Sequence, residues 1–414
     1  MSDKKIIVQK YGGSSVADPE RLRRVAERVA AAVKAGARVV VVVSAMGKTT
    51  DDLLALARKV AREPPRRELD MLLSTGERIS MALLAMALWE LGVPAISFTG
   101  SQSGILTNDR HSGARIIEVR PVRIQDELER DHVVIVAGFQ GMSYKREITT
   151  LGRGGSDTTA VALAAALGAE ACEIYSDVDG VYSADPRVVP EAHHLSEISY
   201  EEMQELAEAG AKVLNAQAVQ WARRAGIVIH ARATAGPLHN PRETRVVQGS
   251  SQADNDDRPR ATAVTGTPHV VVLRSRSHAG ALLRVLGEEG VTLRHCQLSP
   301  GPEGSLDESA SALQATFTCE DLPDFGRTAA ALQRAVPGGS DSGLVLDQSQ
   351  GTVTAVGAGR FGHPATLLPL LAELRERGLT PQSSESGPLR LCLWLPSAQV
   401  AEATRALHDR LCRQ

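Results

Sequence analysis

Two glycine-rich turns in this sequence combine backbone donors with a charged side chain. The first, residues 10–16, reads Lys-Tyr-Gly-Gly-Ser-Ser-Val and lies between an apolar run and a helix expected from Pro19. Glycines lack a Cβ, so backbone N–H groups can approach phosphate oxygens, and the lysine adds a mobile positive charge. Such groups stabilise the charge that develops in phosphoryl transfer. The alternative is an ordinary strand-to-helix turn without a ligand.

The second turn, residues 150–157, reads Thr-Leu-Gly-Arg-Gly-Gly-Ser-Asp and leads into an alanine-rich helix expected to end before Gly168. A helix N-terminus that carries Gly-Gly-Ser is suited to binding an anion. Arg153 supplies a planar pair of donors that matches a carboxylate. Asp157 is expected at the N-cap of the helix, and capping alone would explain it.

A carboxylate at the edge of a buried helix face is the third candidate. In a helix expected over residues 67–91, Leu73, Glu77, Ser80 and Leu84 fall on one stripe at helical spacing. A buried carboxylate must either pair with a charged or hydrogen-bonding group of the protein or bind a ligand. Glu77 is therefore either a ligand-binding group or the partner of a structural arginine.

Further polar residues follow a later strand. Residues 176–187 read Ser-Asp-Val-Asp-Gly-Val-Tyr-Ser-Ala-Asp-Pro-Arg and are expected at the carboxyl edge of a sheet, where open α/β proteins bind ligands. The aspartates resemble part of a calcium loop, but the glutamate and flanking helices of an EF-hand are missing. Lys212, at another helix end, is an additional cation that also suits the helix dipole.

The sequence lacks the common nucleotide-binding motifs. It contains neither a Walker A loop nor the His-Arg-Asp and Asp-Phe-Gly motifs of protein kinases. Gly357, Gly359 and Gly362 nominally match a dinucleotide fingerprint. We reject that match because the following strand turns back through residues 386–388 instead of continuing a parallel sheet.

The elements that must position these residues form an α/β pattern. Up to residue 247, short β-branched runs alternate with helical stretches, which is typical of a mostly parallel sheet covered by helices on both faces. The clearest strands are expected at residues 6–9, 39–43, 133–137 and 172–175. Asp18 is the expected N-cap of the helix from Pro19, and Ser199 with Glu202 forms an expected capping box.

The remaining chain divides into a linker and two similar units. Residues 248–262 are too polar to bury and are expected to link domains. Residues 263–345 and 346–414 each repeat the order of strands and helices that predicts a βαββαβ unit. We therefore predict a first domain over residues 1–247, followed by two small α+β domains.

Composition limits the possible partners. The 414 residues have a net charge of −3 and are 43% hydrophobic, without an apolar run of membrane-spanning length, so neither nucleic acid nor membrane is expected as a partner. The N-terminus lacks a secretory signal pattern, and we expect a cytoplasmic protein. Five cysteines include no Cys-x-x-Cys pair, so neither a disulfide framework nor a metal site is predicted.

Six blocks in order resemble the aspartate kinases of the amino-acid kinase family. Besides residues 10–16 and 150–157, they are 44–47 (Ser-Ala-Met-Gly), 74–80 (Ser-Thr-Gly-Glu-Arg-Ile-Ser), 98–102 (Phe-Thr-Gly-Ser-Gln) and 176–182. The tail resembles the tandem ACT domains that sense pathway end products in this family and build a dimer. The resemblance implies a three-layer kinase domain with a mostly parallel sheet, followed by two ferredoxin-like ACT domains.

The resemblance also implies roles for individual residues. Lys10 would stabilise the transferred phosphoryl group, and Asp157 would order Lys10 and the backbone donors. The L-aspartate pocket would comprise Ser44, Glu77, Arg153 and Ser156. ATP with Mg²⁺ would be held by Lys10, Tyr11, Gly12, Gly13, Ser176, Asp177, Tyr182, Arg187 and Lys212. The implied product is 4-phospho-L-aspartate, which feeds lysine (through diaminopimelate), threonine and methionine synthesis.

The tail departs from the family pattern. Where ACT domains of this family commonly carry acidic residues, this chain has Arg274, Arg276, Arg294 and His295. We therefore expect weak binding of lysine, whereas a zwitterion or an anionic ligand could bind through residues 383–386. Two alternatives stay open: a related kinase with another acceptor, such as glutamate, N-acetylglutamate, uridylate or carbamate, and a catalytically weak amino-acid sensor.

Overall fold

The computed structural model describes residues 4–152, 154–249, 260–301, 306–319, 322, 325–336, 343–357 and 361–412. Arg153 and residues 250–259 of the linker predicted over 248–262 therefore lie outside the described residues. Residues 358–360 of the rejected fingerprint and the start of the helix expected from Asp321 also lie outside them.

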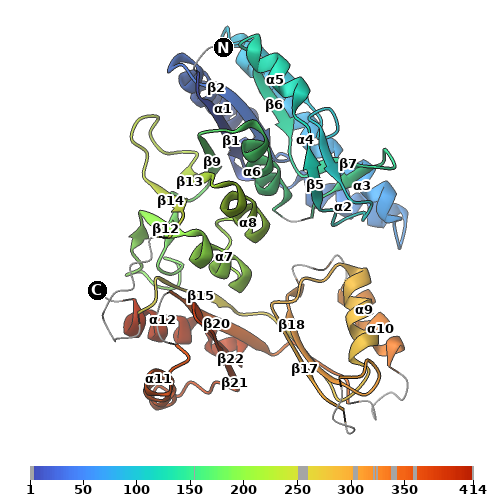
Figure 1. The fold of residues 1–414 in the computed structure, drawn as a ribbon, viewed down its shortest axis with the longest axis vertical. Helices are drawn as coiled ribbons and strands as arrows, with labels where there is room; N and C mark the ends of the chain where they lie inside the picture. The colour runs from blue at the N-terminus through green and yellow to red at the C-terminus, as the bar shows by residue number, and fades with distance from the viewer. Residues whose placement is uncertain are drawn as a thin grey trace. The chain divides into compact units, whose positions relative to one another are not determined.

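The chain forms two compact units (Figure 1). The first comprises Met1–Val181, His194–Ala207 and Lys212–Gln252, and the second comprises Tyr182–His193, Glu208–Ala211 and Ala253–Gln414. Two short segments that precede the expected linker thus belong to the same unit as the tail.

An eight-stranded sheet forms the core of the first unit, in the order β12-β14-β13-β9-β1-β2-β6-β3. The strands are β1 (Ile6–Tyr11), β2 (Arg38–Val43), β3 (Ala95–Phe98), β6 (Val133–Ala137), β9 (Ala171–Ser176), β12 (Glu197–Ser199), β13 (Val228–Ala233) and β14 (Glu243–Val247). All neighbours pair in parallel except β13 with β14. The predicted mostly parallel sheet and each of the four predicted strands are therefore confirmed.

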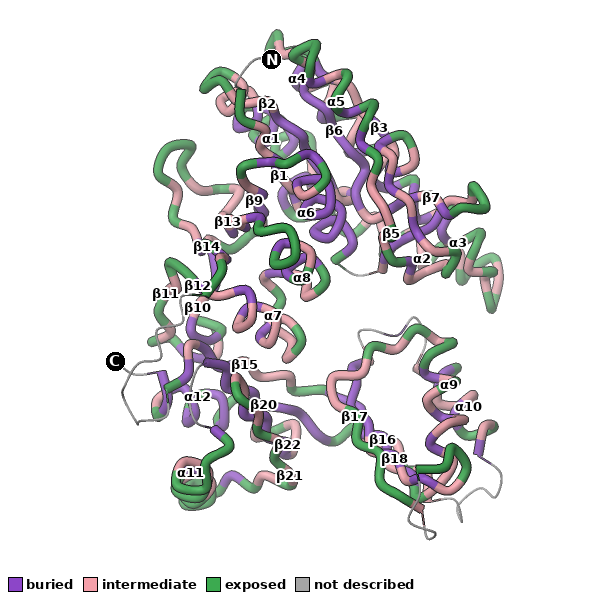
Figure 2. The backbone as a smooth tube through the Cα atoms, viewed as in Figure 1, coloured by how far each residue is buried: buried purple, intermediate pink, exposed green. Residues whose placement is uncertain are grey.

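Helices cover both faces of this sheet. Val39, Val41 and Val43 of β2 pack in one apolar cluster with residues of α1 (Pro19–Lys34) and α4 (Thr75–Glu90). Successive side chains of a strand point to opposite faces, and the alternate residues Val40 and Val42 are also fully buried. Figure 2 shows the central strands as buried along their length. Burial on both sides explains why the strand sequences do not alternate.

The other elements of the first unit surround this sheet. Its remaining helices are η1 (Gly13–Val16), α2 (Thr49–Val60), α3 (Arg66–Leu73), α5 (Val122–Glu129), α6 (Gly155–Leu167), α7 (Tyr200–Ala209) and α8 (Ala216–Ala225). A second sheet has the order β5-β4-β7-β8 and contains β4 (Ile105–Thr107), β5 (Ile116–Val119), β7 (Gln140–Ser143) and β8 (Ile148–Thr150). The short strands β10 (Val181–Tyr182) and β11 (His194–Leu195) pair with each other.

Local capping signals act largely as expected. Asp18 accepts a hydrogen bond from the backbone N of Arg21 at 2.9 Å, and the Ser199 hydroxyl bonds the Glu202 carboxylate at 2.7 Å. The expected N-cap role of Asp157 is wrong. Gly154 is the N-cap of α6 in the left-handed region at φ 70°, and Asp157 lies inside the first turn. A left-handed N-cap favours glycine, which leaves the aspartate free to act elsewhere.

The helix expected over residues 67–91 is divided into α3 and α4, with Ser74 between them. By length and composition, Arg66–Glu90 would suffice to cross a membrane. However, α4 packs on β3, β6 and α1, and its Glu77 is only 2% exposed. We therefore interpret it as a helix that covers the sheet.

The second unit contains two four-stranded sheets, ordered β17-β18-β16-β19 and β15-β20-β22-β21. Their strands are β15 (Ala263–Thr267), β16 (Val271–Ser275), β17 (His295–Ser299), β18 (Ala312–Phe317), β19 (Val345–Asp347), β20 (Gln350–Val356), β21 (Ser383–Ser386) and β22 (Arg390–Pro396). The first sheet packs with α9 (Ala279–Glu289) and α10 (Phe325–Ala335), and the second with α11 (Pro364–Glu376) and α12 (Val400–Leu411).

The strand order differs from the simple tandem arrangement that we expected. Ala263–Thr267 pairs antiparallel with Gln350–Val356 and so belongs to the second sheet, although we placed it in the first repeat. The first repeat is therefore an insertion between the first two strands of the second sheet. Strand and helix periodicity are local signals, whereas the choice of pairing partner is not, so the sequence pattern could not show this exchange.

Candidate active site

The turns after β1 and β2 follow neighbouring strands of the large sheet. Backbone hydrogen bonds continue the pairing beyond the strand ends: Gly12 N donates to Tyr175 O at 3.2 Å, and Ser44 N donates to Tyr11 O at 3.1 Å. Gly47 N donates to the oxygen of another turn residue, Gly13, at 3.0 Å. The turns after β1 and β2 thus lie together at the carboxyl edge, where open α/β sheets bind ligands.

Lys10 and Asp157 join the two glycine-rich turns. Lys10 Nζ lies 2.6 Å from Asp157 Oδ1, and each side chain is 11% exposed. Lys10 comes from the end of β1, and Asp157 comes from the first turn of α6. A buried ion pair of this kind holds its charges in a defined place. It fixes an ammonium beside the positive end of the α6 dipole.

Glu77 is buried with one oxygen unused. Its Oε1 accepts a hydrogen bond from Ala45 N at 3.1 Å. Among the described residues, Oε2 finds no hydrogen-bond partner, and no described cation pairs with this carboxylate. Burial raises the pKa of Glu77 to about 7. An unsatisfied carboxylate oxygen in such an environment favours a cationic or hydrogen-bond-donating ligand.

Two serines complete the described part of the expected acceptor pocket. Ser44 directly follows β2, and Ser156 occupies the first turn of α6, where it is 6% exposed. The sequence analysis missed Gly138, which follows β6. A Cβ on Gly138 would come within 2.7 Å of Ser156 Oγ. A glycine directly after a predicted buried strand was the available signal.

The residues expected to hold ATP are divided between the two units. Lys10, Tyr11, Gly12, Gly13, Ser176, Asp177 and Lys212 lie in the first unit, and Tyr182 and Arg187 lie in the second. Ser176 Oγ accepts a hydrogen bond from Val178 N at 3.2 Å, and the neighbouring Asp177 is exposed. Arg187 pairs with Asp185 at 2.7 Å.

Tyr11 offers the site its backbone only. Its side chain is fully buried and stacks on Tyr175, with ring centroids 4.8 Å apart. Its hydroxyl donates to Gln9 Oε1 at 3.2 Å. Burial raises the pKa of Tyr11 well above its ordinary value, so the phenol stays neutral and structural.

Three of the four basic tail residues already have partners within the second unit, and the first of them, Arg274, pairs with Asp347 at 3.9 Å. Arg294 Nη1 donates to the backbone oxygen of Ala209 and to Thr267 Oγ1, both at 3.0 Å. His295 pairs with Glu385. These contacts direct the side chains into the unit itself, so repulsion of a cationic effector is weaker than we expected. The expectation of weak lysine binding therefore depends on the lack of acidic residues at these positions.

Comparison with known proteins agrees with this geometry. The model of the amino acid kinase family matches residues 5–232. The aspartokinase of Mycolicibacterium smegmatis is 44% identical and covers 98% of this chain and 95% of that protein. The aspartokinase of Thermus thermophilus is 40% identical and covers 98% of each chain.

Solved structures show the same fold. Aspartokinase III of E. coli in complex with aspartate and ADP aligns over 99% of this chain and 100% of that chain, with a TM-score of 0.79 and 24% identity. Fold, site and sequence together define a member of the amino acid kinase family. Within that family, the chain belongs to the aspartokinases.

Proposed function

We propose that this protein transfers the γ-phosphoryl group of ATP to the side-chain carboxylate of L-aspartate, which yields 4-phospho-L-aspartate and ADP. The observation that carries this proposal is the buried Lys10–Asp157 pair, which joins the two glycine-rich turns at the carboxyl edge of the sheet. Phosphoryl transfer requires positioning and charge neutralisation more than covalent chemistry. A fixed ammonium beside a helix N-terminus supplies both.

Lys10 faces the charge that builds up on the transferred phosphoryl group. Asp157 holds the lysine ammonium in place through the 2.6 Å contact and does not touch the acceptor in this scheme. Among the described residues, no group of three or more His, Cys, Asp or Glu is placed to bind a metal ion. Mg²⁺ would arrive with ATP as part of the substrate.

Glu77 binds the ammonium group of L-aspartate in this proposal. Its unused Oε2 gives a position for one N–H donor, and a cation would favour the carboxylate form. Ser44, Ser156 and Arg153 complete the acceptor pocket, with Arg153 on the α-carboxylate so that the β-carboxylate can attack in line. This arrangement distinguishes an α-amino acid from an acceptor without a free amine, such as N-acetylglutamate.

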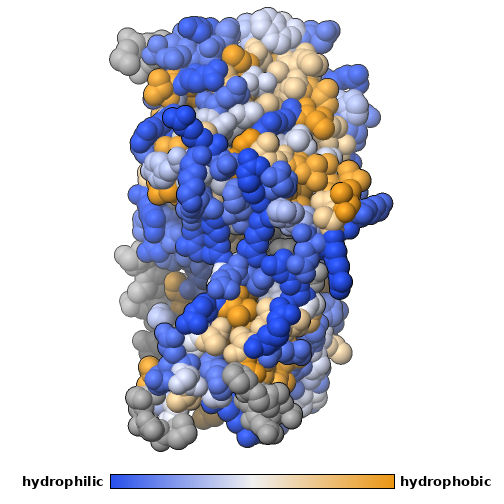
Figure 3. Space-filling view, turned by 90° about the vertical axis from the view of Figure 1, so that its right-hand side faces the viewer, coloured by the Kyte–Doolittle hydropathy of each residue, from blue (hydrophilic) through white to orange (hydrophobic). Residues whose placement is uncertain are grey.

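The remaining assignments follow from the proposed reaction. ATP contacts the backbone at Tyr11, Gly12 and Gly13, together with Ser176, Asp177, Tyr182, Arg187 and Lys212. The reaction would be the first step towards lysine, threonine and methionine in the cytoplasm. The protein would act as a homodimer or larger homo-oligomer, and hydrophobic side chains gather at several places on the face shown in Figure 3. Such patches often mark interfaces. An amino-acid effector would bind the ACT-like units.

Trapping the acyl phosphate with hydroxylamine tests the function. Purified protein is incubated with ATP, Mg²⁺ and hydroxylamine, and L-aspartate, L-glutamate and N-acetyl-L-glutamate serve as separate acceptors. Hydroxamate is expected from aspartate. Product from glutamate or N-acetylglutamate alone would reassign the acceptor, and no product from any of the three would support the sensor alternative.

A further inference from the structure

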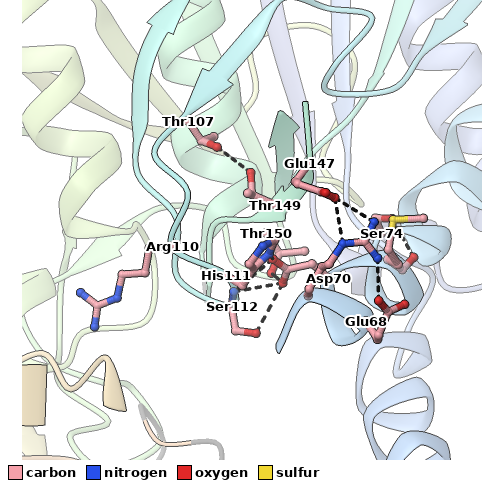
Figure 4. Close-up of polar contacts among 12 residues, drawn as sticks. Glu68, Asp70, Ser74, Thr107, Arg110, His111, Ser112, Glu147, Thr149 and Thr150 are labelled. Carbon is pink, nitrogen blue, oxygen red and sulfur yellow. Dashed lines mark hydrogen bonds and ion pairs between the residues drawn. The ribbon is translucent and has the colours of Figure 1, made fainter. Parts of the chain in front are cut away.

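A fully buried carboxylate lies outside the residues assigned above. Asp70 of α3 is 0% exposed, and its oxygens accept hydrogen bonds from two other segments of the first unit (Figure 4). Thr150 Oγ1 donates to Oδ1 at 2.6 Å, and Ser112 N donates to Oδ1 at 3.0 Å. His111 Nδ1 lies 2.7 Å from Oδ2. Three residues thus converge on one carboxylate and offset the cost of its burial.

Thr150 is the residue that enters the second glycine-rich turn. It ends β8, and its backbone oxygen accepts a hydrogen bond from Ala114 N at 2.8 Å. The next residue, Leu151, donates its backbone N to Phe139 O at 2.9 Å. The contact with Asp70 is therefore a third interaction that holds the start of this turn, in addition to the two backbone hydrogen bonds. The same turn leads to Asp157, which pairs with Lys10.

Asp70 also lies close to the helix that carries Glu77, in the last turn of α3. Its backbone oxygen accepts a hydrogen bond from Ser74 N at 3.0 Å, directly before α4 begins. The oxygen of Ser74 accepts from Gln140 Nε2 at 2.9 Å, and Gln140 is the register partner of Thr150. The Asp70 side chain thus contacts the start of the turn that precedes α6, and the helical turn that contains Asp70 leads directly into α4.

We propose that Asp70 is a positioning residue that sets the spacing between Glu77 and the N-terminal end of α6. This inference rests on the proposed function, because that spacing would define the acceptor pocket. Asp70 contacts no reacting group, so its loss should weaken acceptor binding more than turnover at saturation. Losing a hydrogen bond to a buried carboxylate should raise the KM for aspartate about tenfold.

Substitutions at Thr150 test this proposal with little change in shape. Thr150→Val removes the hydroxyl that contacts Asp70, whereas Thr150→Ser retains a hydroxyl. Thr107→Val is the matched control, because Thr107 Oγ1 contacts Thr149 Oγ1 at 2.6 Å in the same small sheet and both residues are 0% exposed. Asp70→Asn removes the charge itself, and its combination with Thr150→Val measures whether the two groups act together.

Initial rates are measured with aspartate varied at saturating ATP, and aspartate binding without ATP is measured by calorimetry. We expect Thr150→Val to raise the aspartate KM and Kd about tenfold with kcat within about twofold, and Thr150→Ser and Thr107→Val to stay near wild type. Equal effects of Thr150→Val and Thr107→Val would overturn the positioning role. If the wild-type protein does not phosphorylate aspartate, the proposed function fails, and the same comparison is made with the acceptor that hydroxamate trapping identifies.

Discussion

Replacing Glu77 by glutamine tests how the pocket recognises the amino group of aspartate. Burial raises the pKa of Glu77 from its ordinary 4.5 to about 7. The free enzyme would therefore carry this side chain partly protonated at neutral pH. Only the ionised form would attract the aspartate ammonium, so binding should weaken as pH falls below 7.

The magnitude follows from this pKa. At pH 6, about one tenth of Glu77 would be ionised, so kcat/KM for aspartate should be about tenfold below its value at pH 8. The amino and carboxyl groups of aspartate keep their charges over this range. The Glu77→Gln variant should show a low kcat/KM at pH 8 and should lose this part of the pH dependence. The assay is hydroxamate formation at saturating ATP, with aspartate varied at each pH.

The free energy of unfolding gives an independent measurement of the state of Glu77. Because the folded-state pKa is raised, the stability that Glu77 contributes is fully present below pH 4.5 and is lost as pH rises to about 7. Above that pH, the buried charge costs about 3 kcal/mol. Glu77→Gln should therefore raise the free energy of unfolding by up to about that amount at pH 8, and by less at pH 5, in chemical denaturation. The reasoning would be refuted if kcat/KM depended on pH in the same way in the wild type and in Glu77→Gln. It would also be refuted if Glu77→Gln had a lower free energy of unfolding than the wild type at pH 8.

Three further outcomes test other parts of the site. Lys10→Ala should lower kcat about a hundredfold to a thousandfold with little change in aspartate Kd, measured by initial rates and calorimetry; an unchanged kcat at saturation would remove Lys10 from the chemistry. Gly138→Ala should lower the free energy of unfolding by about 1–3 kcal/mol, measured by thermal unfolding, and should raise the aspartate KM. The reason is that its Cβ would come within 2.7 Å of Ser156 Oγ. A variant with wild-type stability and KM would show that the turn after β6 adjusts to the added methyl group. Lysine at millimolar concentration should barely change the initial rate, because Arg294 and His295 stand where the family carries acidic residues, and strong inhibition by lysine alone would contradict this.

Most of the first unit's architecture could be predicted because its signals are local. Strand β6 lies at the predicted residues, and Asp18 caps the helix from Pro19 as the sequence indicated. The stripe that contains Glu77 and Leu84 is buried as expected. Each of these features depends on residues within one or two turns of each other, so spacing alone specifies it.

The sequence by itself indicated the class of this protein through six ordered blocks that resemble the aspartate kinases. It also indicated the local elements, because glycine turns, helix caps and apolar runs depend on neighbouring residues. Tertiary structure decided that Asp157 does not cap its helix, so that its carboxylate is left to pair with Lys10. It also decided that Ala263–Thr267 joins the second tail sheet, and that Asp70 meets Thr150. The physical reason is the same in each case: a buried charge or an unpaired strand edge must find a partner, and the residue that satisfies it lies far away in the chain.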